Sequence, residues 1–188
     1  MSGFLYKKGE LKELIKLAQN SDYKALEEVI RRVQKNVYTI FSHLVHKKED
    51  ISDLTQEALI KMSKNIYTLE DIKSFKSWLN RIITNIFYDY LRKQKPLAED
   101  NSEEILLNLK DEIGCEPGEK CLFSELEKII RAAMLGLPQN LRITIVLREF
   151  EGLSYENIAQ ITNVSLGTVK SRISRARTIL QENLKEFI

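Results

Sequence analysis

Apolar residues recur at three- and four-residue steps along most of the chain, which is the period of amphipathic helices. One stripe of this kind runs over residues 26–44, and a second over residues 54–66 has Ser52 or Asp53 as its expected N-cap. A third ends at Pro96, because proline cannot continue a helix. Glycine is scarce, and no alternating run or Asn-Gly turn predicts paired strands. The pattern therefore predicts an all-α fold.

Signals for helix ends are clearest in the last third of the chain. Pro138 is expected to open one helix and Gly152 to close it. Ser154 and Ser165 are suitable N-caps for two more helices, and the short turn 162–165 separates them. A helix, a tight turn and a helix form the unit that places its second helix in the major groove of DNA.

Charge divides the helical stretches into two groups. The net charge is only +2, but acidic residues dominate positions 97–127 and basic clusters lie before and after them. Acidic stretches with few aromatic residues do not form a core. We therefore predict an N-terminal helical bundle at residues 1–95, an acidic linker at residues 96–121 and a C-terminal helix-turn-helix domain at residues 122–188.

The second helix of the predicted helix-turn-helix has one apolar and one polar side. At about 100° per residue, the positions that converge inward are Val169, Ile173, Ala176 and Leu180. The opposite side has hydroxyls and cations and lacks the carboxylates that DNA would repel. An ordinary amphipathic hairpin with a solvated basic face is the alternative. The candidate DNA contacts are Thr168, Lys170, Ser171, Arg172, Ser174 and Arg175.

A second polar stripe lies on the helix that ends at Pro96. If Leu79 is buried, the opposite face carries Arg81, Asn85, Tyr88 and Arg92. Cations, an amide and a ring are the groups that bind the backbone, the base edges and the base faces of a single strand. Alternatively, Tyr88 is a half-exposed surface ring with no role in strand binding. Asp89 falls nearer the core side, and Trp78 and Phe87 are interpreted as core residues.

Several short motifs resemble those of a known family. Gly167–Arg172 followed by Arg175–Arg177 resembles the promoter-reading domain of bacterial sigma factors, most of all the extracytoplasmic-function (ECF) group. Upstream, Asp53-Leu54 and Gln56-Glu57 resemble the "DLxQE" helix of that family, and residues 77–94 resemble the stretch after it. The motifs occur in the family's order and cover nearly the whole chain.

The resemblance implies a protein that binds core RNA polymerase and directs it to promoters. The C-terminal set above is then expected to read the upstream promoter element as duplex DNA. The N-terminal domain is expected to capture the downstream element as a melted strand, with Leu69 closing a pocket for an extruded base. In the family, the polymerase-binding residues dock on the clamp coiled coil of the largest polymerase subunit. In this sequence they are Asp53, Leu54, Gln56 and Glu57, and the residues for the downstream element are Leu69, Arg81, Asn85, Tyr88, Asp89 and Arg92.

Other expectations concern partners, location and chemistry. The family implies a monomer when free and an anti-sigma partner, often at the membrane. The N-terminus lacks the apolar core of a secretory signal, so we expect a cytoplasmic protein. No catalytic constellation or phosphate loop is apparent, so we expect no enzymatic activity, no small-molecule substrate and no cofactor. His43 and His46 alone do not make a metal site. Whether Cys115 and Cys121 have a redox role is left open.

Two other functions are compatible with parts of the pattern. An autonomous helix-turn-helix regulator would bind operators tightly as a dimer, with the N-terminal module sensing a signal. A sigma-mimicking inhibitor would occupy the polymerase without reading promoters. No heptad seam for a dimer is evident, and the inhibitor would need a damaged reading surface, whereas Lys170, Arg172 and Arg175 are present. The sequence therefore favours a polymerase specificity subunit.

Overall fold

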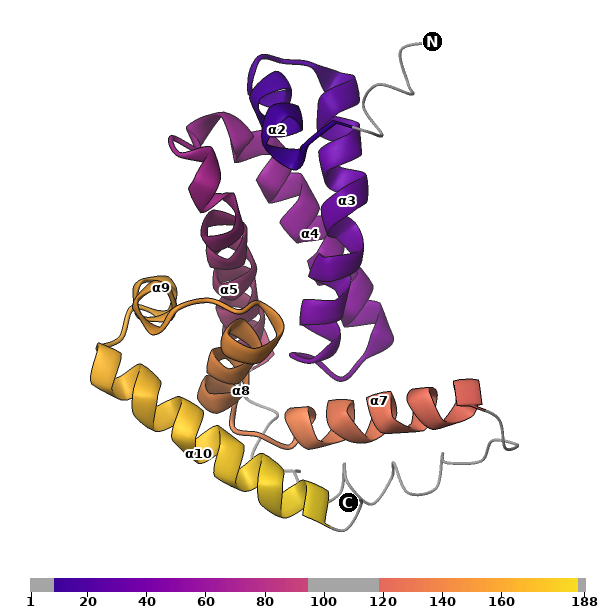
Figure 1. Ribbon diagram of the computed structural model, residues 1–188, viewed down its shortest axis with the longest axis vertical. Coiled ribbons are helices and arrows are strands. Elements are labelled where there is room, and N and C mark those ends of the chain that lie inside the picture. Colours follow the sequence, from indigo (N-terminus) through magenta and orange to yellow (C-terminus); the bar gives the residue numbers. More distant parts are fainter. Residues whose placement is uncertain (1–8, 95–118, 186–188) are drawn as a thin grey trace. The chain divides into compact units, whose positions relative to one another are not determined.

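The computed structural model describes residues 9–94 and 119–185, and the regular elements in these ranges are all helical (Figure 1). The chain forms two compact units, Met1–Phe41 with Lys47–Asp89 and Ser42–His46 with Tyr90–Ile188. The predicted all-α class with two helical domains is confirmed. The predicted linker lies mostly outside the described residues, as does Cys115, so the boundaries at residues 95 and 121 stay predictions.

The first unit is built on three long helices. Their inward stripes are fully enclosed at Val37, Phe41, Met62, Ile83 and Phe87, and burying each such side chain stabilises the unit by roughly 1.5–3 kcal/mol. Two short 3₁₀ turns lead from the second long helix to the third. Apart from Ser42 and residues 90–94 at two helix ends, this unit consists of α2 (Leu11–Gln19), α3 (Tyr23–Ser42), α4 (Lys48–Asn65), η1 (Ile66–Thr68), η2 (Ile72–Ser74) and α5 (Phe75–Gln94).

The short helix α2 was not predicted. It buries Leu14, Ile15 and Ala18 and contacts η1 and η2, the turns that connect α4 to α5. It therefore lies beside the connection between α4 and α5.

The start of α4 differs from the prediction. The helix begins at Lys48, so Lys47 is the N-cap residue, and Ser52 and Asp53 lie inside the second turn. The hydroxyl of Ser52 donates to the carbonyl of Lys48 instead of capping a helix end. The earlier start is explained by Ile51, which is 2% exposed and begins the buried stripe one turn before Leu54. The helix α5, in contrast, ends at Gln94, two residues before Pro96, as predicted.

The second unit is organised around its last helix, which contacts the three preceding α-helices. Pro138 is the N-cap residue of one of these helices, and Gly152 follows a π-helical turn with a φ of +62°. Both predicted helix-end signals are therefore confirmed. The elements are α7 (Glu119–Leu135), α8 (Gln139–Ile145), η3 (Val146–Phe150), α9 (Tyr155–Thr162) and α10 (Leu166–Leu184).

A buried arginine fixes the α7–α8 turn. The guanidinium of Arg142, 8% exposed, donates to the carbonyls of Leu135 and Leu137. Burial lowers the pKa of Arg142 to about 10, so the side chain stays charged at neutral pH. A charge-assisted donor that satisfies several carbonyls at once holds the end of α7 against the start of α8.

Candidate nucleic-acid interface

The helix-turn-helix forms at the predicted residues. The Ser154 hydroxyl accepts from the Asn157 backbone N–H at 3.2 Å, and the Ser165 hydroxyl accepts from the Thr168 N–H at 3.1 Å. Asn163 ends α9 in the left-handed conformation, with a φ of +53°, which asparagine tolerates better than most residues. Both predicted caps are therefore confirmed.

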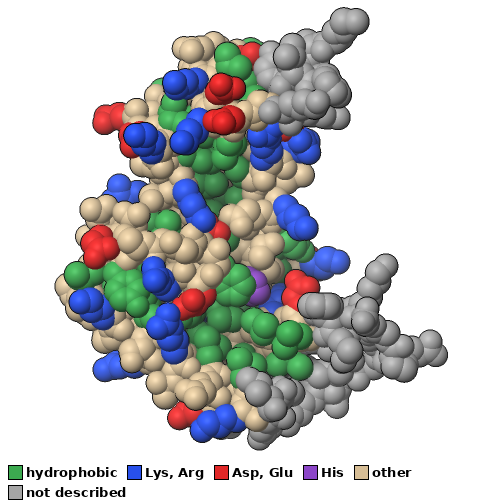
Figure 2. Space-filling view, in the orientation of Figure 1, with side chains coloured by type: hydrophobic (Ala, Val, Ile, Leu, Met, Phe, Trp, Pro, Cys, Tyr) green, Lys and Arg blue, Asp and Glu red, His purple; other side chains and the backbone are tan. Residues whose placement is uncertain are grey.

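The two sides of α10 separate as the helical arithmetic predicts. Val169, Ile173 and Ala176 are buried at 0–1% exposure, and Leu180 is half-buried. Lys and Arg side chains are visible over α10 at the lower left of Figure 2. We call the exposed side of α10 the reading face. Its residues are Lys170, Ser171, Ser174, Arg175 and Thr178.

Two residues near the reading face have partners within the unit, and a third is half-buried. The hydroxyl of Thr168 is 2.8 Å from that of Ser165, and Arg177 donates to the carboxylate of Glu149 at 2.6 Å and 3.1 Å. Arg172 is half-buried, and its Nη1 is enclosed without a hydrogen bond. Of the three arginines at the centre of α10, Arg175 and Arg177 are exposed, and Arg177 is paired with Glu149.

Glu156 is the acidic residue nearest in sequence to the turn between α9 and α10, and its carboxylate interacts with the start of α9. Its carboxyl bonds to its own backbone N–H and to the Ser154 hydroxyl, which lowers its pKa, with smaller contributions from Lys170 and Arg148. A carboxylate in the first turn of α9 also complements the positive end of the helix dipole. The acid therefore stabilises α9.

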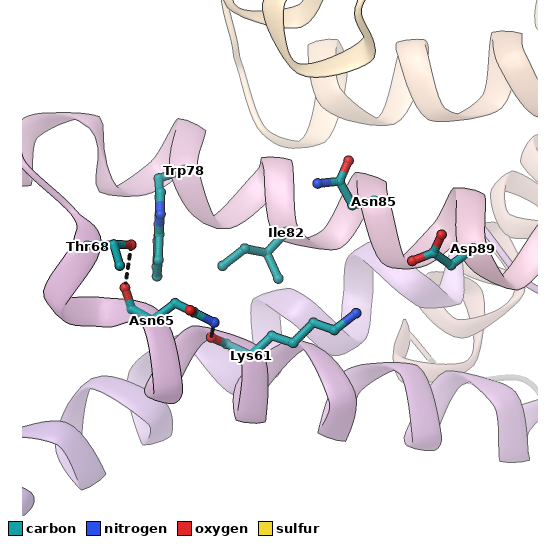
Figure 3. Close-up of a pocket in the computed structure, with 7 residues that line it drawn as sticks. All are labelled: Lys61, Asn65, Thr68, Trp78, Ile82, Asn85 and Asp89. Carbon is teal, nitrogen blue, oxygen red and sulfur yellow. Dashed lines mark hydrogen bonds between the residues drawn. The ribbon is translucent and has the colours of Figure 1, made fainter.

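The first unit contains an open pocket of about 390 Å³ between α4 and α5, which we call the α4–α5 pocket. Trp78, Ile82, Asn85 and Asp89 follow one another at steps of four, three and four residues along one side of α5 (Figure 3). Across from them, α4 and η1 contribute Lys61, Asn65 and Thr68. An aromatic ring, an exposed amide and both signs of charge therefore meet in one depression.

Short hydrogen bonds connect the α4 side of this pocket. The Thr68 hydroxyl donates to the carbonyl of Asn65 at 2.7 Å, and the Asn65 amide donates to the carbonyl of Lys61 at 2.8 Å (Figure 3). The Lys61 ammonium pairs with Glu57 at 2.7 Å, with both side chains about two-fifths exposed. At that exposure the pair contributes little to stability, so the ammonium can exchange Glu57 for another anion at low cost.

The pocket includes part of the predicted single-strand set and adds to it. Asn85 and Asp89 line it, whereas Arg81, Tyr88 and Arg92 are not among its lining residues. The sequence interpretation had Trp78 as a core residue, but the indole is half-buried and forms one wall. Lys61, Asn65 and Thr68 were missed because nothing in their spacing shows that α4 faces this side of α5.

Two predicted contact residues lie in the core. Leu54 is 7% exposed and Leu69 is 4% exposed, so both side chains pack inside the unit, and their direct contacts with a partner stay predictions. Leu54 continues the inward apolar stripe of α4, and Leu69 follows η1 with its side chain in the core. Asp53 and Gln56 are exposed on the outer side of α4, and Glu57 is partly exposed beside them.

Within residues 9–94 and 119–185, no three His, Cys, Asp or Glu side chains are grouped as metal ligands. No helix in the described part of the chain is both long and apolar enough to cross a membrane.

Comparisons with known proteins agree with the geometry of both units. The model for sigma-70 region 2 matches residues 29–96, and the model for sigma-70 region 4 matches residues 127–180. The first range contains the α4–α5 pocket, and the second contains the helix-turn-helix with its reading face.

Relatives and solved structures match over nearly their whole lengths. The ECF RNA polymerase sigma-E factor of Haemophilus influenzae is 36% identical over 93% of this chain and 95% of that protein. SigW of Bacillus subtilis, also an ECF RNA polymerase sigma factor, is 30% identical over 94% of this chain and 98% of its own length. The Bartonella quintana sigma factor RpoE, crystallised with the anti-sigma factor NepR, matches with a TM-score of 0.66 and 28% identity over 86% of this chain and 98% of that chain. The chain therefore belongs to the ECF group of sigma factors, which direct RNA polymerase in transcription initiation.

Proposed function

We propose that this sigma factor reads its promoters in two physical states. The reading face of α10 binds the upstream element as duplex DNA, and the α4–α5 pocket captures a base of the downstream element after the strands separate. The observation that carries the proposal is the composition of the pocket, in which Trp78, Asn85 and Lys61 surround one opening.

Each of these three groups matches one part of a nucleotide. An indole stacks on a base, an amide donates to and accepts from a base edge, and an ammonium attracts a phosphate. Extruding a base from a duplex costs a few kcal/mol, and stacking on an aromatic side chain returns roughly 1–3 kcal/mol. Stacking alone therefore only just balances the cost, and the contacts of Asn85 and Lys61 are needed to make the captured state favourable.

The reading face suits a duplex for different reasons. Arg175 is exposed in the middle of α10, where an arginine can make two parallel hydrogen bonds to guanine in the major groove. Ser171 and Ser174 are small enough to let the helix lie close to the base edges. The N-terminal end of α10 and Lys170 contribute attraction for the phosphates.

Attachment to the polymerase is proposed for the outer side of α4. Asp53, Gln56 and Glu57 form a polar surface there, one turn away from Lys61 and the pocket. We assign this surface to the clamp coiled coil of the largest polymerase subunit. One helix would then join the polymerase near its middle and border the captured strand with its last turns.

An anti-sigma factor is the further partner that we propose. The Bartonella quintana relative was crystallised with one, and the solved structure of CnrH, which shows the same fold at 21% identity, contains the cytosolic domain of CnrY. The proposed place of action is the cytoplasm, where the polymerase is found.

Holoenzyme binding to promoter fragments tests the duplex half of this proposal. Arg175→Ala should weaken binding to a double-stranded upstream element by roughly 1–3 kcal/mol and should lower the preference for that sequence over a scrambled one. Lys128→Ala, which removes an exposed cation from α7, is the control and should keep the preference. Unchanged sequence preference in the Arg175 variant would show that the reading face does not read the upstream element.

A further inference from the structure

The turn that borders the α4–α5 pocket is held from outside by one side chain of α2. Gln19, the last residue of α2, donates its side-chain amide to the carbonyl of Ile66 at 3.0 Å and to that of Leu69 at 2.7 Å. These carbonyls are 47 and 50 residues away in the sequence. A single NH₂ group thus bridges the beginning and the end of the turn formed by η1.

The same turn carries two residues of the pocket. Asn65 precedes η1 and Thr68 is its last residue, and both line the pocket opposite Trp78 (Figure 3). The Thr68 hydroxyl binds the Asn65 carbonyl, and the Asn65 amide binds the Lys61 carbonyl. Hydrogen bonds therefore connect Gln19, through the backbone of the turn, to the wall of the pocket.

Side-chain packing fixes the position of the turn, whereas hydrogen bonds fix the orientation of its backbone. Ile66 and Leu69 are 3% and 4% exposed, so their side chains anchor the turn in the core. The carbonyls that receive the Gln19 amide are only partly buried. Water can replace the amide there if it is lost, so the fold is retained while the turn gains freedom.

We propose that Gln19 is a positioning residue for strand capture, which holds the η1 turn in the shape that receives an extruded base. This inference rests on the proposed role of the α4–α5 pocket. It assigns to α2 a specific effect on the melted strand, although no residue of α2 is among those that line the pocket. Duplex reading by α10 and attachment through α4 should not depend on it.

The test uses holoenzyme assembled from core polymerase and full-length chain. The probes are promoter fragments with a duplex upstream element and a single-stranded downstream extension, each with one abasic nucleotide at a different position. For the wild type, removing the captured base should weaken binding several-fold at one position. Gln19→Met, which keeps the size of the side chain and removes the donor, should weaken binding of the complete fragment about fivefold and bind the abasic fragment almost as the wild type does.

Two further variants separate positioning from general stability. Gln19→Lys keeps a donor that can reach both carbonyls, so it should retain the ratio of affinities for the complete and abasic fragments. Leu17→Met places the same new side chain at an exposed position of α2 and should behave as the wild type. Thermal unfolding and co-purification with core polymerase check that every variant is folded and attached.

The outcomes distinguish this inference from the function on which it rests. If Gln19→Met weakens complete and abasic fragments equally, or if Gln19→Lys behaves like Gln19→Met, the positioning role is overturned. If the wild type is insensitive to every abasic position, the pocket does not capture a base, and the proposed function fails first. Loss of the affinity ratio in Gln19→Met and its recovery in Gln19→Lys would support the proposal.

Discussion

Replacing Asn85 by alanine tests the pocket with little disturbance of the fold. The side chain is exposed in the middle of α5, and alanine has the higher helix propensity by up to about 0.7 kcal/mol. The free energy of unfolding should therefore not decrease. The variant removes the amide between Ile82 and Asp89 along the pocket (Figure 3).

The expected loss follows from a single hydrogen bond. A hydrogen bond between an amide and a base edge contributes about 0.5–1.5 kcal/mol net, which corresponds to roughly a two- to tenfold loss of affinity for the melted strand. Trp78 and Lys61 stay in place, so binding should weaken without being abolished. Affinity for a fully duplex upstream fragment should be unchanged, because that fragment does not enter the pocket.

Fluorescence anisotropy of the holoenzyme with fork-junction promoter fragments measures this effect. The control is Gln34→Ala, which removes an exposed amide from the middle of α3, away from the pocket. The reasoning is refuted if Asn85→Ala, folded as stably as the wild type, binds the fork fragment with unchanged affinity. It is also refuted if Gln34→Ala produces an equal loss.

Two predictions concern stability. Hydrogen bonds from Arg31, and then from Arg32, lower the pKa of the Glu28 carboxyl to about 2, so its stabilising effect is complete above its ordinary pKa of 4.5 and disappears as the pH falls toward 2. Glu28→Gln should therefore lower the urea midpoint at pH 7 and approach the wild type in acid, and an equal difference at pH 7 and pH 3 would contradict this cause. Ile173 is 1% exposed and lies under the reading face. Ile173→Ala should therefore lower the free energy of unfolding by roughly 2–5 kcal/mol. A loss below 1 kcal/mol in chemical unfolding would show that α10 is not packed as described.

Helical period and cap chemistry made most of the fold predictable. The stripes of α3, α4 and α5 and the caps Ser154 and Ser165 depend on neighbours within a few residues, so the sequence contains the whole signal. The start of α4 was misplaced because a buried Ile51 extends the helix past residues that are good caps elsewhere. The helix α2 was missed although Leu14, Ile15 and Ala18 follow the helical period, because the stripe extends over only nine residues. Contacts with η1 and η2 stabilise it.

The candidate site was predictable on α10 and only in part on α5. On α10 one inward stripe defines the exposed side, so the helical arithmetic was sufficient. On α5 the pocket side is offset from the predicted stripe: both contain Asn85, but the pocket has Trp78 where the stripe has Arg81. A helical wheel cannot show which of two adjacent sides meets a neighbouring helix. Lys61, Asn65 and Thr68 come from that neighbour, so only the tertiary structure brings them to the site.

The mapping of transcription start sites on a library of promoter fragments, with core polymerase and this chain, tests the central claim most directly. We predict that the selected promoters share an upstream and a downstream motif. Arg175→Ala should relax only the upstream motif and Asn85→Ala only the downstream one. Relaxation of both motifs by either variant, or of neither motif by both variants, would contradict the division of promoter reading between a duplex-binding helix and a strand-capturing pocket.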